Sequence, residues 1–218
     1  MLTYLAAHMR TPLYDERFSQ LDEAIGFYWP RWFEFIQAHG MQDIVLLIAY
    51  FSVLPQIFGS ILFFAHTQLS NRNWELFCMA VFAFAITTGF AYSFPALGAF
   101  YHFDTAISRA VHLPDLFHLV AGTKTSFSLP EMQGIVTFPS YHAAVAVILT
   151  YVYRGKLFLF QGIAVLNVVM LLSTPTYGGH YLVDILGGIS VAIVSIFIFN
   201  KIAKTTFYDQ AIQTNNIR

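Results

Sequence analysis

Residues 177–199 read YGGHYLVDILGGISVAIVSIFIF, a polar start followed by an almost wholly apolar run. Residues 138–153 have the same design, because FPSYH precedes AAVAVILTYVY. Apolar runs of this kind approach the roughly 20 residues that a helix needs to cross a bilayer. The two stretches therefore predict membrane helices that begin with ionisable side chains. Such groups are costly at the mouth of a membrane helix and seldom serve packing alone.

The whole chain has the composition of an integral membrane protein. Of its 218 residues, 57% are hydrophobic, 17% aromatic and only 11% charged, and the mean hydropathy is +0.60. A soluble domain carries about 25% charged residues. The formal net charge of -1 argues against nucleic acid as a partner. Cys78 is the only cysteine, which excludes an intrachain disulfide and a cysteine metal site.

Five apolar runs predict an all-α fold, a polytopic membrane helix bundle of five or six spans. The expected spans are residues 44–66, 74–100, 135–153, 157–173 and 181–199. Together they make a membrane domain over residues 44–200. The segments outside the spans are an external N-terminal segment with an interfacial helix at 1–43, an external loop at 101–134 and a cytoplasmic tail at 201–218.

Basic residues set the expected orientation. They gather in three segments that the span pattern puts on one side: Arg72, Arg154, Lys156, Lys201, Lys204 and Arg218. The positive-inside rule places that side in the cytoplasm. Both histidine stretches then face the extracytoplasmic side, which we expect to be that of a bacterial inner membrane. An external N-terminus without a preceding span is unusual, so either an upstream helix is missing from this chain or the first span inserts in the reverse sense.

The two histidine stretches carry groups suited to nucleophilic and acid–base chemistry. His180 and Asp184 are four residues apart, so on a helix they share one face. A carboxylate there can hold an imidazole in one tautomer and stabilise its cation, and His142 supplies a second imidazole. Ser140 is a good N-cap for a helix start, which favours phosphate. Gly179 lets the backbone approach a ligand.

These motifs resemble those of the type 2 phosphatidic acid phosphatase superfamily of membrane lipid phosphatases and phosphotransferases. Its second signature, Pro-Ser-x-His, is matched by residues 139–142, and its third, Ser-Arg-x5-His-x3-Asp, by Ser173, His180 and Asp184. The resemblance implies that His180 attacks phosphorus and becomes phosphohistidine, that Asp184 orients it and that His142 protonates the leaving oxygen. It also implies that no metal or other cofactor is needed.

Two departures from the family pattern reduce the charge available to hold phosphate. Thr174 stands where the third signature has arginine, and the first signature, Lys-x6-Arg-Pro, is absent, since Lys124 is followed at the matching distance by Glu131. This pattern is most similar to the inositolphosphorylceramide-synthase-like branch, and also resembles sphingomyelin synthases. A phosphodiester carries one negative charge rather than nearly two, so fewer cations suit it. Transfer of a head group between lipids therefore stands beside hydrolysis, with a phospholipid or sphingolipid as substrate.

The residues expected to contact that substrate are Ser140, Tyr141, Gly179, Tyr101, Arg109 and Lys124. Two alternatives remain open. His142, His180 and Asp184 could instead bind a metal, since imidazole and carboxylate suit zinc. The chain could also be a non-catalytic scaffold or a transporter subunit. A transporter places polar groups near the bilayer midplane, whereas here they gather at one face.

Overall fold

The computed structural model describes residues 13–105 and 137–216, with side chains up to residue 203. Within these residues every regular element is a helix, which confirms the all-α prediction. Three helices are long and apolar enough to cross a membrane: α6 (Ser70–Ser93), α10 (Leu157–Gly178) and the part of α11 (Leu182–Asn216) up to residue 203. A fourth span is possible if a bent pair of helices counts as one. These lengths are compatible with a polytopic membrane protein.

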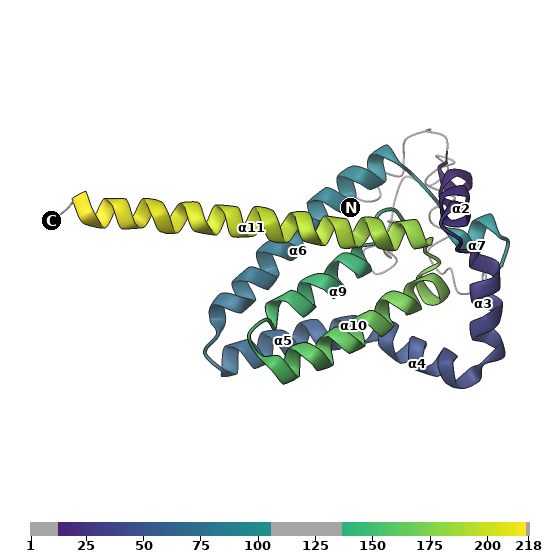
Figure 1. Ribbon diagram of the computed structural model, residues 1–218, viewed down its shortest axis with the longest axis horizontal. Coiled ribbons are helices and arrows are strands. Elements are labelled where there is room, and N and C mark those ends of the chain that lie inside the picture. The colour runs from purple at the N-terminus through teal and green to yellow at the C-terminus, as the bar shows by residue number, and fades with distance from the viewer. Residues whose placement is uncertain (1–12, 106–136, 217–218) are drawn as a thin grey trace, which may run out of the picture.

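The first expected span is that bent pair. Helices α4 (Gly40–Phe51) and α5 (Val53–His66) meet at an angle of 48° on either side of Ser52. Pro55 has no N–H to donate to the carbonyl of Phe51, and the Ser52 hydroxyl donates to the Ala49 carbonyl at 2.6 Å. Both features disturb the backbone ladder, and proline is the usual cause of such a kink. The break leaves α4 against α10 (Figure 1), with Tyr50 in its last turn.

The second expected span, residues 74–100, differs from the helix that forms. Helix α6 begins at Ser70 and ends at Ser93, just before Pro95. The residue before a proline is pushed out of the helical region, which ends the helix early. A connection at 94–98 and the short helix α7 (Ala99–His102) follow. This connection turns the chain back over the end of the bundle.

The third expected span forms a shorter helix, α9 (Tyr141–Val152), of 12 residues. At 1.5 Å per residue it is about 18 Å long, less than the hydrocarbon thickness of a bilayer. It lies among α5, α6, α10 and α11, and Ala143, Ala144 and Ala146 are fully buried. Small residues allow helices in a membrane to approach closely. The buried helix α9 is therefore the centre of the bundle.

The fourth expected span, 157–173, continues past its expected end. Helix α10 runs through Pro175 to Gly178. Pro175 cannot donate to the Leu171 carbonyl, but the Thr174 hydroxyl donates to it at 2.7 Å. Because the freed carbonyl is satisfied, the helix tolerates the proline. The extra turn carries the chain to the start of the next helix.

The fifth expected span, 181–199, lies within α11 except for its first residue, and the described backbone of α11 continues beyond the other helices (Figure 1). Near its start, a Cβ at Gly188 would lie 2.2 Å from the Ser140 carbonyl oxygen. A Cβ at Gly187 would lie 3.0 Å from atoms of Phe138 and Pro139. The two glycines therefore allow the start of α11 to pack directly on the start of α9.

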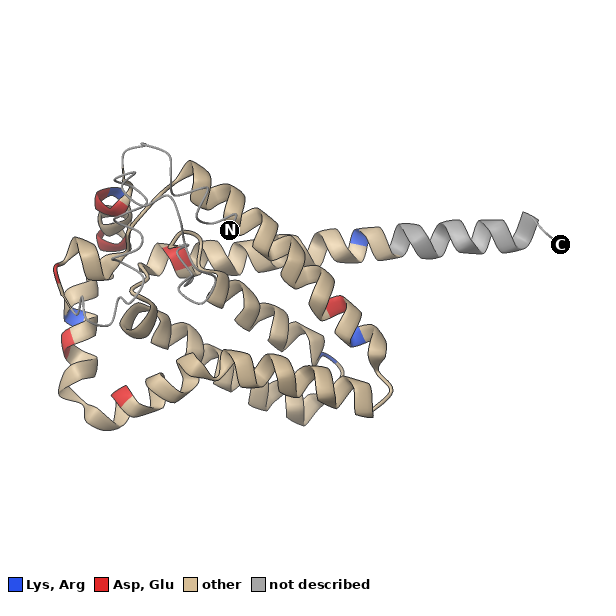
Figure 2. Cartoon of the chain, turned by 180° about the vertical axis from the view of Figure 1, so that it is seen from behind, with Lys and Arg blue, Asp and Glu red and all other residues tan. Residues whose placement is uncertain are grey.

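Two helices at the N-terminal side cover this end of the bundle. They are α2 (Asp15–Ala24) and α3 (Trp29–Ala38), where the sequence suggested a single interfacial helix. Gly26, with φ at +83°, makes the turn between them. An apolar cluster joins them to α7 and to the segment before α11: Phe18, Trp29, Phe33, Ala96, Leu97, Ala99, Phe100 and Tyr181. Most described acidic residues lie at this end, and the spans are nearly free of charge (Figure 2).

Candidate active site

His180 lies in the short connection between α10 and α11, because α11 begins only at Leu182. We expected His180 and Asp184 to share one face of a helix. Because His180 precedes α11, the two residues instead meet across the start of that helix. Gly179 ends α10 in the left-handed region, at φ +63°. A Cβ there would lie 2.5 Å from the ring of Phe100, so only glycine fits this turn. The tight turn places the His180 side chain in the interior, where it is 6% exposed.

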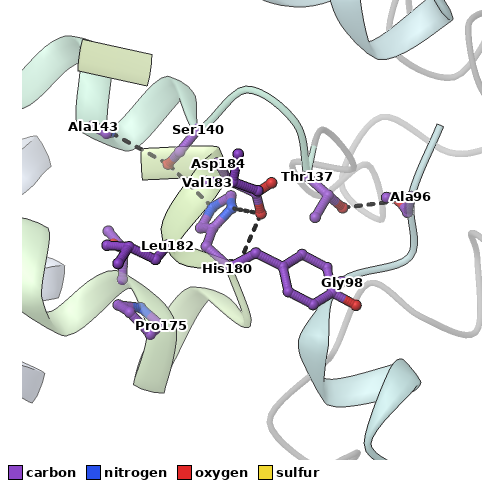
Figure 3. A network of polar contacts seen from close by, with 12 residues as sticks. Ala96, Gly98, Thr137, Ser140, Ala143, Pro175, His180, Leu182, Val183 and Asp184 are labelled. Carbon is purple, nitrogen blue, oxygen red and sulfur yellow. Dashed lines mark hydrogen bonds and ion pairs between the residues drawn. The ribbon is translucent and has the colours of Figure 1, made fainter. Parts of the chain in front are cut away.

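The imidazole of His180 bridges the starts of α9 and α11. Its Nδ1 is 3.3 Å from Oδ2 of Asp184, and its Nε2 is 3.3 Å from the Ser140 hydroxyl oxygen (Figure 3). Burial lowers the pKa of His180 to about 4, so the ring is neutral at pH 7. In the tautomer that donates from Nδ1 to the carboxylate, Nε2 carries the lone pair and faces the Ser140 hydroxyl. This is the state required of a nucleophilic imidazole.

Asp184 is fully buried in the first turn of α11. Its Oδ2 also accepts a hydrogen bond from the Tyr181 N–H at 2.9 Å, whereas Oδ1 has no partner among the described residues. A buried carboxylate with an unsatisfied oxygen is costly unless a positive charge forms beside it. An imidazolium at His180 would supply that charge. The arrangement therefore favours reactions in which His180 becomes positive.

Ser140 caps α9 and joins it to α11. Its hydroxyl accepts a hydrogen bond from the Ala143 N–H at 3.4 Å, and its own N–H donates to the Asp184 carbonyl at 2.9 Å. Its side chain is fully buried. The N–H groups of the first turn of α9 thus start beside His180 Nε2. A helix start in this position attracts an anion.

His142 lies in the first turn of α9, and its ring stacks on Tyr50. The ring centroids are 4.8 Å apart and the planes differ by 11°. Tyr50 also lies near His180, because a Cβ placed at Gly178 would be 3.3 Å from both the Tyr50 hydroxyl oxygen and His180 Nε2. Both imidazoles therefore adjoin one tyrosine. The sequence analysis did not single out Tyr50, which is one of many aromatic residues in an apolar run.

Two aspartates of α2 accept hydrogen bonds from the segments next to His180. Asp22 accepts hydrogen bonds from the N–H groups of Leu182, at 2.7 Å, and Val183, at 2.8 Å, and so caps α11. Asp15 accepts from the N–H groups at 97 and 98 and from the Tyr181 hydroxyl at 3.1 Å. Burial raises the pKa of both aspartates. Their spacing of seven places them on one helix face, but nothing local in the sequence names their partners.

Two tryptophans of α3 hold the end of α10. Trp29 Nε1 donates to the Pro175 carbonyl at 3.1 Å, and Trp32 Nε1 donates to the Thr176 hydroxyl at 3.0 Å. Thr174, at the place of the family's arginine, is fully buried and uses its hydroxyl within its own helix. Position 174 therefore offers no donor to a ligand.

The other residues expected to contact substrate lie in different surroundings. The Tyr141 hydroxyl donates to the Ala80 carbonyl in α6 at 3.2 Å. Tyr101 is 38% exposed on α7, and Gly179 is covered by Phe100. The remaining two, Arg109 and Lys124, lie outside the described residues. Of the nine expected residues, the structure brings Ser140, His180 and Asp184 into direct contact and places His142 next to them through Tyr50.

The alternative of a metal site requires several ligands around one point. In residues 13–105 and 137–203, no group of three or more His, Cys, Asp or Glu side chains is arranged to hold a metal ion. The partners of His180 are a carboxylate, a hydroxyl at a helix start and the backbone of Thr137. The helix start beside them attracts an anion.

Comparison with known proteins gives one match. A family model described as the PAP2 superfamily matches residues 16–198. The chain belongs to the PAP2 superfamily. No curated protein and no solved structure matches it significantly. The PAP2 match begins inside α2 and ends inside α11, so it includes the two N-terminal helices together with both histidine stretches. Membership supports a phosphatase-type membrane enzyme in general.

Proposed function

We propose that this protein removes or transfers the phosphorylated head group of a lipid through a phosphohistidine formed on His180. The observation that carries the proposal is the buried, neutral imidazole whose Nδ1 faces Asp184 and whose Nε2 faces the start of α9. Membership of the PAP2 superfamily supports the reaction class.

The reaction has two steps. In the first, His180 Nε2 forms a bond to phosphorus while the bond from phosphorus to the lipid oxygen breaks, and that oxygen takes a proton from the imidazolium form of His142, which becomes neutral. Asp184 compensates the positive charge on the His180 ring. In the second, His142 removes a proton from water or an alcohol, which attacks phosphorus and releases His180. The transferred group would lie at the N–H groups of the first turn of α9.

Head-group transfer between lipids is the second candidate. Its support is Thr174, whose hydroxyl is bonded within α10 where the family signature has arginine. Each missing charge-assisted contact to a phosphate oxygen is worth roughly 1.5–3 kcal/mol. Loss of such contacts weakens binding of a dianion more than that of a monoanion. The preferred substrate is therefore a phosphodiester head group, as in the inositolphosphorylceramide-synthase-like branch.

The site is proposed to face the extracytoplasmic side of a bacterial inner membrane. At the start of α6, Glu75 forms ion pairs with Arg72 at 3.0 Å and with Arg154 at 2.7 Å. The far end of the 24-residue helix leads to the connection that packs on the His180 segment. The positive-inside rule assigns the arginine end to the cytoplasm.

The test uses purified protein and a panel of lipid phosphomonoesters and phosphodiesters, with release of phosphate, release of head group and formation of new lipids as readouts. His180→Ala should lose turnover entirely, whereas the matched control His66→Ala, at an exposed position on α5, should retain it. Activity should also survive exhaustive chelation. Loss of activity on chelation, with recovery when zinc is added, would establish the metal-site alternative instead. Absence of turnover on every lipid would favour the scaffold or transporter alternative.

A further inference from the structure

The position of Tyr50 beside the site could not be predicted from the residues around it in the sequence. It lies in the last turn of α4, immediately before the break at Ser52, and its ring stacks on that of His142. The ring of Tyr177, in α10, also lies near that of Tyr50, with ring centroids 6.0 Å apart and planes tilted by 34°. The Tyr177 hydroxyl donates to the Asp43 carbonyl at 2.9 Å, which ties α10 to α4. The Tyr50 ring is therefore in contact with two other rings, those of His142 and Tyr177.

The hydroxyl of Tyr50 lies close to the His180 ring, and Gly178 lies beside both. The absence of a side chain at Gly178 is required here. An added Cβ would lie 2.7 Å from His180 Cδ2 and 3.3 Å from the Tyr50 hydroxyl oxygen. The Tyr50 hydroxyl and His180 Nε2 thus both lie 3.3 Å from the point that the Cβ of any other residue at 178 would occupy.

The hydroxyls of two neighbouring tyrosines have partners, whereas that of Tyr50 has none among the residues that the structure describes. Tyr141 donates to Ala80, and Tyr181 donates to Asp15. The Tyr50 hydroxyl, on a half-buried side chain, makes no hydrogen bond within the described part of the chain. A donor held rigidly beside a nucleophile, with no protein partner, suits a ligand.

We propose that Tyr50 is a catalytic residue that donates its O–H to a non-bridging oxygen of the phosphoryl group under attack by His180. This inference rests on the proposed function. The hydroxyl stays protonated throughout, and no bond to Tyr50 forms or breaks. A neutral donor replaces part of what the missing arginine supplies, and it suits a singly charged phosphodiester. The stacked ring in turn keeps His142 beside the same phosphoryl group.

The experiment compares full-length Tyr50→Phe, Tyr50→Leu and Tyr153→Phe with the unaltered protein. Tyr153 is a matched control, because its buried hydroxyl donates to Ser60 at 3.1 Å far from His180. Orthovanadate, which adopts the geometry of a phosphoryl group in transfer, is the probe. Its binding is measured from inhibition of lipid turnover and from stabilisation against heat. Tyr50→Phe should weaken vanadate binding and kcat by about 10-fold to 100-fold. Its melting temperature without vanadate should match that of the unaltered protein, because the removed hydroxyl has no partner among the described residues, whereas Tyr153→Phe loses its hydrogen bond to Ser60.

Each other outcome overturns either the proposed role of Tyr50 or the proposed function. If Tyr50→Phe behaves as the unaltered protein, the hydroxyl has no role, and a loss confined to Tyr50→Leu shows that ring stacking alone matters. If neither the unaltered protein nor Tyr153→Phe binds vanadate or turns over lipid, the proposed function itself fails. Should Tyr50→Phe not fold, 3-fluorotyrosine in place of Tyr50 keeps the shape and strengthens the donor. It should bind vanadate more tightly, and unchanged binding overturns the proposal.

Discussion

Removal of the Asp22 carboxylate should destabilise the protein and reduce its activity together. Asp22 is 2% exposed and caps α11 through two backbone N–H groups, at 2.7 and 2.8 Å. In Asp22→Ala both N–H groups lose their partner in a partly buried site. An unsatisfied donor costs about 1–3 kcal/mol. Relief of the buried charge, whose pKa is raised by burial, offsets part of this loss. We therefore expect a net loss of about 2–4 kcal/mol of unfolding free energy.

Three variants separate the cap from general effects of charge. Asp22→Asn keeps one acceptor oxygen and should cost about 1 kcal/mol. Glu23→Ala removes an exposed neighbouring carboxylate and should change stability by less than about 0.5 kcal/mol. Thermal unfolding in detergent micelles, followed by tryptophan fluorescence, ranks the three, with about 2–4 °C expected for each kcal/mol. Trp29 and Trp32 lie in the same end of the protein and report on it directly.

The activity of the Asp22 variants tests the link to the site. Because the capped turn carries Asp184, loosening it should lower kcat at temperatures where the variant is still folded. If Asp22→Ala matches Glu23→Ala in both melting temperature and kcat, the cap is not what holds α11 and the reasoning is refuted.

Four further outcomes are expected. Asp184→Asn should lower kcat by about 10³-fold to 10⁴-fold while leaving the protein folded, because it loses the carboxylate that orients His180. The fall of kcat/KM at acidic pH should have its midpoint near pH 4 rather than 6.5. Burial lowers the pKa of His180 to about 4, and only the neutral ring attacks. A midpoint near 6.5 would contradict this. A cysteine at exposed Gln20, in a Cys78→Ala background, should react with an impermeant thiol reagent in intact cells, and labelling only after lysis would reverse the orientation. Glu75→Gln should cost about 1–3 kcal/mol of unfolding free energy in thermal unfolding without changing kcat, because two arginines lose their shared partner.

Interruptions in the apolar runs show why helix ends were harder to predict than helices. Pro95 ends α6 before the expected residue 100, whereas Pro175 lies inside α10. The difference lies in the surroundings of each proline. At Pro175 the Thr174 hydroxyl takes up the freed Leu171 carbonyl, and Trp29 takes up the carbonyl of Pro175 itself. Trp29 and Pro175 are 146 residues apart in the chain, so their contact could not be predicted from the sequence around either one.

The sequence by itself determined the membrane class, the helical fold and the residues with reactive groups. Burial of apolar runs in a bilayer depends on composition and length, and both can be read along the chain. The pairing of His180 with Asp184 could be read as well, because it joins residues four apart. Only the tertiary structure decided which groups support them. Asp22 reaches Leu182 across 160 residues, and Tyr50, in a broken span, stacks on His142 and lies near His180. Such contacts depend on which faces of separate helices meet, and that is settled by packing of the whole bundle rather than by any one segment.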